Sequence, residues 1–390
     1  MAVPDWIWFV IIFAFGSCVG SFLNVVVFRL PRDKSLIRPP SACPACGRPI
    51  RFYDNIPLIS WMILGAKCRY CKSPISPRYF IIELLTALLF TGLFILYFRT
   101  GLYPGLSSFL EGGWYVYLVH IVLLAALIAA SAIDLELWVI PVSICWFVTA
   151  VGLIGSGIAP YVVGAEKISQ NLLLPSTSDI FLKEVTIGSL SAGALTGLAI
   201  SWVLLATGVF KRSYECDDSE DSPNKPEESA EPAFNHRLEI CREIIFLLPI
   251  IACALAAYGI SSRYSQINKW WLNLLQRPAI AGLMGGLWGY FVGCGVVWFT
   301  RIFGTLGFGK EAMGLGDVHL MGAAGAVIGP ILVVVAFFIA PFFGLAWAGF
   351  QMFFKKTRQI PYGPFLSLGI FAVMILRDWI FDYLSFMFYR

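Results

Sequence analysis

The chain has 390 residues, of which 58% are hydrophobic and only 13% are charged, and its formal net charge is +4. A soluble protein carries about 25% charged residues, so this composition cannot coat a soluble fold of the same size. Most of the chain must therefore lie in lipid, and a protein whose body binds nucleic acid is excluded.

The net charge is the sum of two very different polar segments. Residues 29–78 contain ten Lys or Arg and two Asp, a net charge of +8, whereas residues 211–231 contain eight acidic and three basic residues, a net charge of −5. The positive-inside rule places the basic segment in the cytoplasm and the N-terminus outside. We expect its charge to contact anionic lipid headgroups, which makes membrane lipids a predicted partner.

Apolar runs predict ten membrane spans. The run Val318–Ile328 is too short to cross a bilayer alone, so it is predicted to be a half-helix or a tilted short span. Alternation from outside also places the basic run 355–358 in the cytoplasm and both termini outside. The predicted spans are Trp6–Phe28, Tyr79–Phe98, Trp114–Ile133, Trp138–Ile158, Thr186–Phe210, Ile244–Ile260, Ile280–Phe303, Val318–Ile328, Ile331–Phe354 and Phe365–Leu384.

These runs divide the chain into five parts. Within the fourth part, residues 211–242 are predicted to form an acidic cytoplasmic loop, because their first two-thirds are rich in Ser, Pro and Glu and almost lack large apolar residues. The predicted parts are a first transmembrane helix (1–30), a cytoplasmic cysteine domain (31–78), transmembrane helices (79–158), an insertion with extra membrane helices (159–277) and C-terminal transmembrane helices (278–390).

Four cysteines in the basic segment form two Cys-x-x-Cys pairs, Cys43 with Cys46 and Cys68 with Cys71, separated by 21 residues. Each pair can direct two thiolates at one tetrahedral metal ion, and two pairs complete its shell. The alternatives are disulfides, redox chemistry or unliganded thiols, but cytoplasmic thiols stay reduced and available to zinc. A closed shell has no open position, so we predict a structural zinc. The predicted fold class is an all-α polytopic membrane protein, with about 8–10 transmembrane helices and a small cytoplasmic zinc-knuckle domain.

Few ionisable residues lie within the apolar spans, and they are candidate functional residues because charges in lipid are costly. Asp134 ends the third span, and Asp317, in the motif Gly314-Leu-Gly316-Asp317, begins the short one. The predicted topology puts both on the cytoplasmic side. Two adjacent carboxylates resist joint ionisation, so one can activate a water while the other, protonated, polarises a scissile carbonyl. The alternative for each aspartate is a helix N-cap or an interfacial charge.

Two other classes of function are consistent with these residues. A proton-coupled transporter would use Asp134, Asp317 and Glu83 as a relay, and it predicts paired broken helices at the membrane midplane and internal symmetry. A zinc-knuckle scaffold without chemistry predicts that the two aspartates do not meet. The sequence has no visible repeat, and both aspartates are expected near the interface, which disfavours the transporter.

The motifs together resemble the bacterial type IV prepilin peptidases, which are membrane aspartic proteases of the GxGD type. The resemblance implies that Asp134 and Asp317 are catalytic, with Gly314 and Gly316 supporting the site. It rests on Gly20-Ser-Phe-Leu-Asn-Val25, the two cysteine pairs with their flanks up to Glu83, Asp134 seven positions before Pro141, Gly314–Asp317, and Ile360-Pro-Tyr-Gly-Pro-Phe365.

The chain departs from the family pattern at three places. His319 stands where the family usually has Lys, and Glu136 stands where many members have a second Asp; both are predicted to support the active site. The insertion at 159–277 adds two spans to the family's usual eight, so we expect it to fold away from the aspartates.

The resemblance implies an enzyme of the bacterial inner membrane whose active site faces the cytoplasm. Such enzymes cut the leader from type IV prepilins or type II secretion pseudopilins after a Gly. They then methylate the new N-terminus with S-adenosylmethionine. No glycine-rich nucleotide-binding motif is visible, so no residue is predicted to bind that methyl donor.

Overall fold

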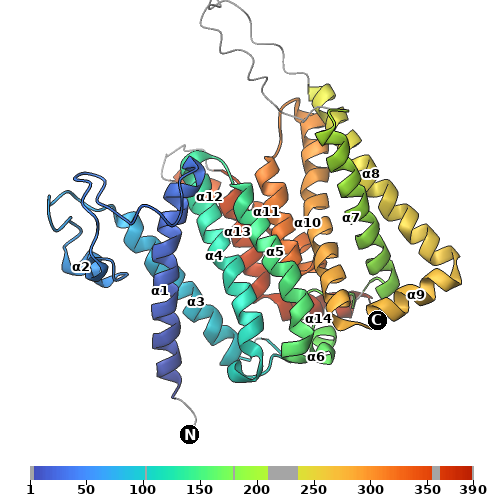
Figure 1. Ribbon diagram of the computed structural model, residues 1–390, viewed down its shortest axis with the longest axis horizontal. Coiled ribbons are helices and arrows are strands. Elements are labelled where there is room, and N and C mark those ends of the chain that lie inside the picture. The colour runs from blue at the N-terminus through green and yellow to red at the C-terminus, as the bar shows by residue number, and fades with distance from the viewer. Residues whose placement is uncertain (1–3, 102, 179–180, 210–235, 354–360, 389–390) are drawn as a thin grey trace, which may run out of the picture.

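A computed structural model describes residues 4–101, 103–178, 181–209, 236–353 and 361–388 (Figure 1). The basic run 355–358 and residues 211–235 of the predicted acidic loop lie outside these ranges. Within the described residues, all regular elements are helical, and extended pairing is limited to two isolated bridges. The prediction of an all-α fold is therefore confirmed.

Fourteen α-helices are found in the described part of the chain, together with short helical turns. They are α1 (Asp5–Arg29), α2 (Ile59–Ile63), α3 (Pro77–Phe98), α4 (Gly113–Leu137), α5 (Val142–Ala159), α6 (Ala165–Asn171), α7 (Glu184–Ala206), α8 (His236–Arg263), α9 (Ser265–Leu275), α10 (Pro278–Phe308), α11 (Leu315–Ile328), α12 (Pro330–Phe353), α13 (Gly363–Ile375) and α14 (Arg377–Phe388). The short turns are η1 (Leu30–Arg32), η2 (Phe52–Asp54), η3 (Phe109–Glu111) and η4 (Pro160–Gly164).

Eight of the described helices are long and apolar enough to cross a membrane: α1, α3, α4, α5 with its continuation into α6, α7, α8, α10 and α12. The last predicted span does not form one straight helix, because α13 and α14 meet at an angle of 74°. At this break Arg377 is buried, and its guanidinium lies 4.7 Å from the Tyr103 ring centroid and bonds to Asp378. Burial of this charged side chain accompanies the change in direction.

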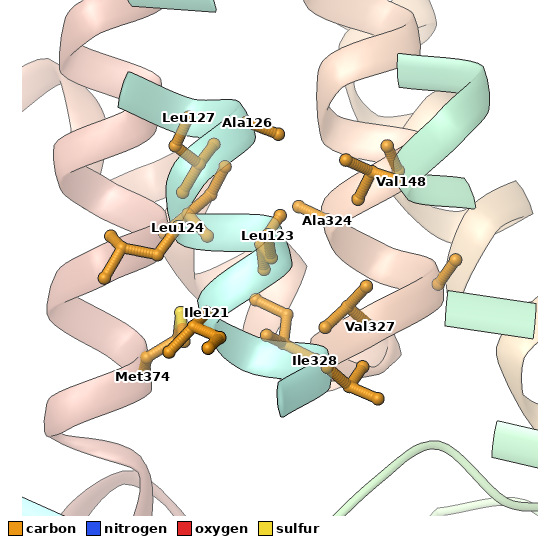
Figure 2. Packing of buried hydrophobic residues seen from close by; sticks show 14 of the residues in the cluster. Ile121, Leu123, Leu124, Ala126, Leu127, Val148, Ala324, Val327, Ile328 and Met374 are labelled. Carbon is orange, nitrogen blue, oxygen red and sulfur yellow. The ribbon is translucent and has the colours of Figure 1, made fainter. Parts of the chain in front are cut away.

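Helix α11 is the short apolar element predicted at Val318–Ile328. Its 14 residues rise roughly 21 Å, less than the hydrocarbon core of a bilayer, which is about 30 Å thick. Helix α11 contacts α4, α5, α10, α12 and α13, and Figure 2 shows side chains of α4, α5 and α13 around its residues Ala324, Val327 and Ile328. The side chains of Val318, Met321 and Val327 are completely buried. A helix that neighbouring helices surround does not need to match the bilayer thickness.

Glycines bring the backbones of α10 and α11 into direct contact. A Cβ added at Gly289 would lie 2.0 Å from the carbonyl oxygen of Gly325, and one added at Gly293 would lie 2.3 Å from that of Met321. No larger residue fits at either position without separating the helices. The close packing of α10 and α11 therefore depends on these glycines.

The termini of the central helices gather at one end of the bundle (Figure 1). Helix α4 ends there, and α11 and α13 begin there, at the end where α1 leads into the cysteine domain. Helices α7 and α8 pack against each other beside α10, at the opposite flank from α1 and α3. The predicted insertion thus supplies the α7–α8 pair.

Candidate active site and metal centre

Asp134 lies on the last turn of α4 and its residue is only 5% exposed. Its Oδ2 accepts a hydrogen bond of 3.1 Å from the backbone N–H of Gly363, which begins α13. The first N–H groups of a helix have no partner within it, so the carboxylate satisfies one of them. A Cβ at position 363 would lie 2.5 Å from Oδ2, so any larger residue would force the carboxyl group to shift.

Asp317 lies on the first turn of α11 and its residue is 9% exposed. Its backbone N–H bonds to the carbonyl oxygen of Gly314 at 3.2 Å. The next contact joins the two aspartate segments: a Cβ at Gly316 would lie 2.8 Å from Cβ of Ile140, in the loop that follows α4. Ile140, six residues after Asp134, therefore packs directly against the backbone next to Asp317.

The two aspartates share one site at this end of the bundle, although 183 positions separate them in the sequence. Ile140 lies next to both: a Cβ at Gly316, the neighbour of Asp317, would lie 2.8 Å from its Cβ, and a Cβ at Gly363, which binds Asp134, would lie 3.0 Å from its Cδ1. Buried carboxyl groups in one site can divide the roles of base and acid between them. The assignment of Asp134 and Asp317 as the catalytic pair stays a prediction.

The other predicted supporting residues surround the aspartates unequally. A Cβ at Gly314 would be 3.7 Å from Oδ2 of Asp317, so this glycine borders the carboxylate. The ring of His319 faces Trp146 of α5, with 6.0 Å between ring centroids. Glu136 forms an ion pair with Arg78 and so links the end of α4 to the end of the cysteine domain.

Glu83 takes part in a different contact. Its Oε2 accepts a hydrogen bond of 2.8 Å from the backbone N–H of Leu58, at the start of α2, and its residue is 8% exposed. The carboxylate therefore attaches the cysteine domain to α3. This hydrogen bond explains why Glu83 is buried, and no proton relay is needed to account for it.

Sequence reasoning missed several residues around the aspartates. Arg301 of α10 is fully buried and forms an ion pair of 2.7 Å with Glu243 of α8. A charged residue inside the predicted span Ile280–Phe303 was the available signal for Arg301. Gly363 and Ile140 carry no such signal, because their importance arises only from contacts between distant segments.

The four predicted metal ligands converge in the cysteine domain. The Sγ atoms of Cys43, Cys46, Cys68 and Cys71 all lie within 4.8 Å of one another, and those of Cys43 and Cys71 are 3.8 Å apart. Four sulfurs about 2.3 Å from a tetrahedral zinc ion are separated by about 3.8 Å. The cluster could therefore hold zinc in a closed shell.

Both cysteine pairs have the same local backbone. The N–H of Cys43 bonds to the carbonyl of Arg48 at 3.0 Å, and that of Cys68 bonds to the carbonyl of Ser73 at 2.8 Å. Backbone N–H groups of Cys71 and Tyr70 also point at the Cys68 sulfur and lower the pKa of this thiol to about 6. A thiolate at neutral pH is the form that binds metal.

An ion pair stabilises the turn between Cys68 and Cys71, the second cysteine pair. Arg69, between Cys68 and Cys71, donates from Nε and Nη2 to both carboxylate oxygens of Asp54, over 2.6–3.0 Å. These hydrogen bonds lower the pKa of Asp54. Paired bonds of this kind fix direction as well as distance.

The described residues thus combine two buried aspartates at the ends of bundle helices with a four-cysteine cluster in the cysteine domain. Two segments of the chain match known families: residues 14–97 match the bacterial peptidase A24 N-terminal domain, and residues 244–349 match the type IV leader peptidase family. Asp317 lies within the second match, and Asp134 lies between the two. The second match begins inside the segment predicted to be an insertion.

Curated relatives extend these matches. A prepilin leader peptidase/N-methyltransferase from Klebsiella pneumoniae is 33% identical over 168 residues, which is 42% of this chain and 68% of the relative. A protein of the same name from Myxococcus xanthus is 46% identical over 34% of this chain and 36% of the relative. The type 4 prepilin-like proteins leader peptide-processing enzyme of Escherichia coli is 26% identical over 93% of this chain and 91% of the relative.

The chain belongs to the type IV leader peptidase family. Its alignments span 36% of the Myxococcus xanthus relative and 50% of the one from Aeromonas hydrophila, less than two thirds of either. No solved structure matches the chain.

Proposed function

We propose that the protein is a membrane-embedded aspartic endopeptidase that removes the leader from prepilins. The observation that carries this proposal is that Asp134 of α4 and Asp317 of α11 are both buried in one site at a common end of the bundle. The substrates are type IV prepilins or type II secretion pseudopilins, cut after a Gly. Family membership and the names of the relatives support this substrate class.

The two aspartates carry the hydrolysis together. One carboxylate accepts a proton from a water molecule, whose oxygen attacks the scissile carbonyl carbon, while the protonated partner donates its hydrogen bond to the carbonyl oxygen. The tetrahedral intermediate then collapses, the C–N bond breaks, and the leaving amine receives a proton from the carboxyl group that took it from water. Gly363 holds Oδ2 of Asp134, so the orientation of this carboxyl group is set before substrate arrives.

The active site faces the cytoplasm, and the protein resides in the bacterial inner membrane. The net charge of +8 on residues 29–78 supports this orientation, because the cysteine domain lies at the same end of the bundle as the aspartates (Figure 1). A leader peptide of a membrane-anchored substrate would approach the site from that side. The basic surface of the cysteine domain then lies against anionic lipid headgroups.

Zinc bound by the four cysteines has a structural role. Cys43, Cys46, Cys68 and Cys71 would hold the ion and leave no open position for substrate. The ion would replace the apolar core that a domain of this size cannot build alone.

The enzyme also methylates the new N-terminus with S-adenosylmethionine, a proposal that rests on the names of the relatives. Two of the recesses among the described residues are lined almost entirely by apolar side chains. One, of 440 Å³, lies along α10 and is lined by Val296, Phe299 and Phe338; the other, of 300 Å³, is lined by Trp347, Phe350 and Phe365. Neither has charged side chains to hold an amino acid and a sulfonium, so neither fits, and we assign no residue to the donor.

The decisive experiment incubates the purified full chain with a prepilin that has a Gly-Phe cleavage junction. Asp134→Asn and Asp317→Asn are each expected to abolish cleavage, whereas Asp33→Asn, an exposed aspartate outside the site, should cleave normally. Cleavage retained by either active-site variant would overturn the pair. Transfer of a labelled methyl group to the cleaved product tests the second activity separately.

A further inference from the structure

Arg301 is the largest completely buried side chain among the described residues, and it is charged. It lies on α10 within a bundle whose surroundings are lipid and apolar side chains. A buried arginine is costly to desolvate, and such residues are therefore candidates for a functional role.

The guanidinium of Arg301 connects three elements. Its Nε lies 2.7 Å from Oε1 of Glu243, on α8, and its Nη1 lies 2.8 Å from Oε1 of Glu311. The same Nη1 donates a hydrogen bond to the carbonyl oxygen of Met313. Met313 directly precedes Gly314, so the arginine holds the backbone that enters the Gly314–Asp317 motif.

A second tether lies one helical turn further along α10. The hydroxyl of Thr305 accepts a hydrogen bond of 3.3 Å from the backbone N–H of Ala312, and Thr305 is 1% exposed. Gly304 permits this approach, because an added Cβ there would lie 2.6 Å from Cβ of Ala312. Two successive loop residues, Ala312 and Met313, are thus hydrogen-bonded to side chains of α10.

The tethered loop determines where Asp317 stands. The segment is held at both ends, because Arg301 binds the carbonyl of Met313 and Gly316 packs against Ile140 with no room for a Cβ. The charge of Arg301 is also within electrostatic range of the Asp317 carboxyl group. Arg301 is thus linked to Asp317 through the backbone of residues 313–316.

We propose that Arg301 is a positioning residue that holds the loop before Asp317 in the register needed for cleavage, with Glu243 of α8 as its counter-charge. The proposal rests on the proposed peptidase function. It gives α8 a role in the active-site geometry, although the sequence predicted that the inserted segment folds away from the aspartates.

The test compares Arg301→Met, Arg301→Lys and Glu243→Gln with the wild-type chain and with Arg99→Met. Arg99, which follows the last residue of α3, forms an ion pair with Asp5. Its replacement therefore controls for the removal of an ion-paired arginine. Prepilin cleavage gives kcat and KM, and amide hydrogen exchange of residues 309–316 reports the loop without using activity. Wild-type cleavage tests the proposed function itself.

Arg301→Met is expected to lower kcat about 100-fold with KM changed less than about twofold, because a misplaced catalytic group slows chemistry more than binding. Arg301→Lys should have a kcat about tenfold higher than that of Arg301→Met, because lysine keeps the positive charge but lacks the planar set of N–H donors of a guanidinium. Exchange should accelerate in residues 309–316 while α10 itself stays protected. Arg99→Met should match the wild type in both measurements.

Two results would overturn the proposal. The first is wild-type kcat and loop exchange in Arg301→Met. The second is a loss of kcat in which exchange accelerates equally throughout α8 and α10, which would indicate a purely structural role. If Arg301→Met does not fold, Gly304→Ala displaces the loop with the charges intact, and unchanged kcat in that variant would also refute the proposal. A wild-type chain that does not cleave prepilin would refute the proposed function, while the exchange measurement would still decide whether Arg301 holds the loop.

Discussion

The backbone N–H of Gly363 donates a hydrogen bond to the carboxylate of Asp134 across 229 positions of sequence. Asp134 ends α4 and Gly363 begins α13, so the contact joins two helix termini at the same end of the bundle. A helix N-terminus carries a partial positive charge that suits a carboxylate. The start of α13 is therefore part of the candidate active site.

Gly363→Ala is expected to reduce prepilin cleavage at least about tenfold, because misplacement of a catalytic group by about 1 Å can cost 100-fold. The added Cβ would lie 2.5 Å from Oδ2 of Asp134 and must displace the carboxyl group. Gly344→Ala on α12 is the matched control, since its Cβ would make an ordinary contact of 3.7 Å with Phe365. Equal cleavage rates in the two variants would contradict this account.

The contact between Gly316 and Ile140 predicts coupled effects. Gly316→Ala places a Cβ 2.8 Å from Cβ of Ile140 and should lower cleavage about tenfold by separating the aspartates. Ile140→Gly removes the opposing atom, so the double variant should lose less activity than the two single losses combined. The check is a double-mutant cycle on kcat, and strictly additive losses would show that the two positions act independently.

Glu83 is predicted to act as an anchor and not as a proton carrier. Glu83→Ala leaves the Leu58 N–H without its acceptor, which costs about 1–3 kcal/mol, whereas Glu83→Gln keeps an acceptor oxygen. We expect faster limited proteolysis of residues 31–78 in the alanine variant and near-normal resistance in the glutamine variant. A glutamine variant as damaged as the alanine variant would instead indicate that the charge itself is needed.

The cysteine cluster is predicted to hold one zinc ion per chain. Cys68→Ser should abolish the bound zinc measured by atomic emission, and Cys18→Ser, at an exposed cysteine of α1, should leave it unchanged. Because zinc binds the deprotonated thiolates, zinc retention after dialysis should fall as the pH is lowered. Zinc in the Cys68→Ser protein would contradict the assignment.

Asp54 is predicted to stabilise the second knuckle at all pH values used for the enzyme. Its pKa is lowered, chiefly by the hydrogen bonds from Arg69, so its contribution is complete above the ordinary value of 3.8 and is lost only at lower pH. Asp54→Asn should therefore speed zinc release to a chelator by the same factor at pH 6 and at pH 8. A factor that changed between these pH values would assign the effect to another group.

Much of the architecture could be predicted from local sequence. Hydropathy located the spans because each must be apolar over the thickness of the bilayer, and the short run at Val318–Ile328 is helix α11. The bend between α13 and α14 was not predicted. The bend coincides with burial of Arg377 against Tyr103. A hydropathy profile cannot predict this contact, because the two residues are far apart in the sequence.

The low charged fraction and the unequal charge segments determined, by themselves, that the chain lies in a membrane, and they predicted its orientation. They also made Asp134 and Asp317 conspicuous, since few acids remain outside the polar segments. Only the tertiary structure decided what surrounds these aspartates: Gly363, Ile140 and the Arg301–Glu243 pair. The physical reason is that the cost of a charge in lipid can be read one residue at a time, whereas a close approach or an ion pair depends on segments that only folding brings together.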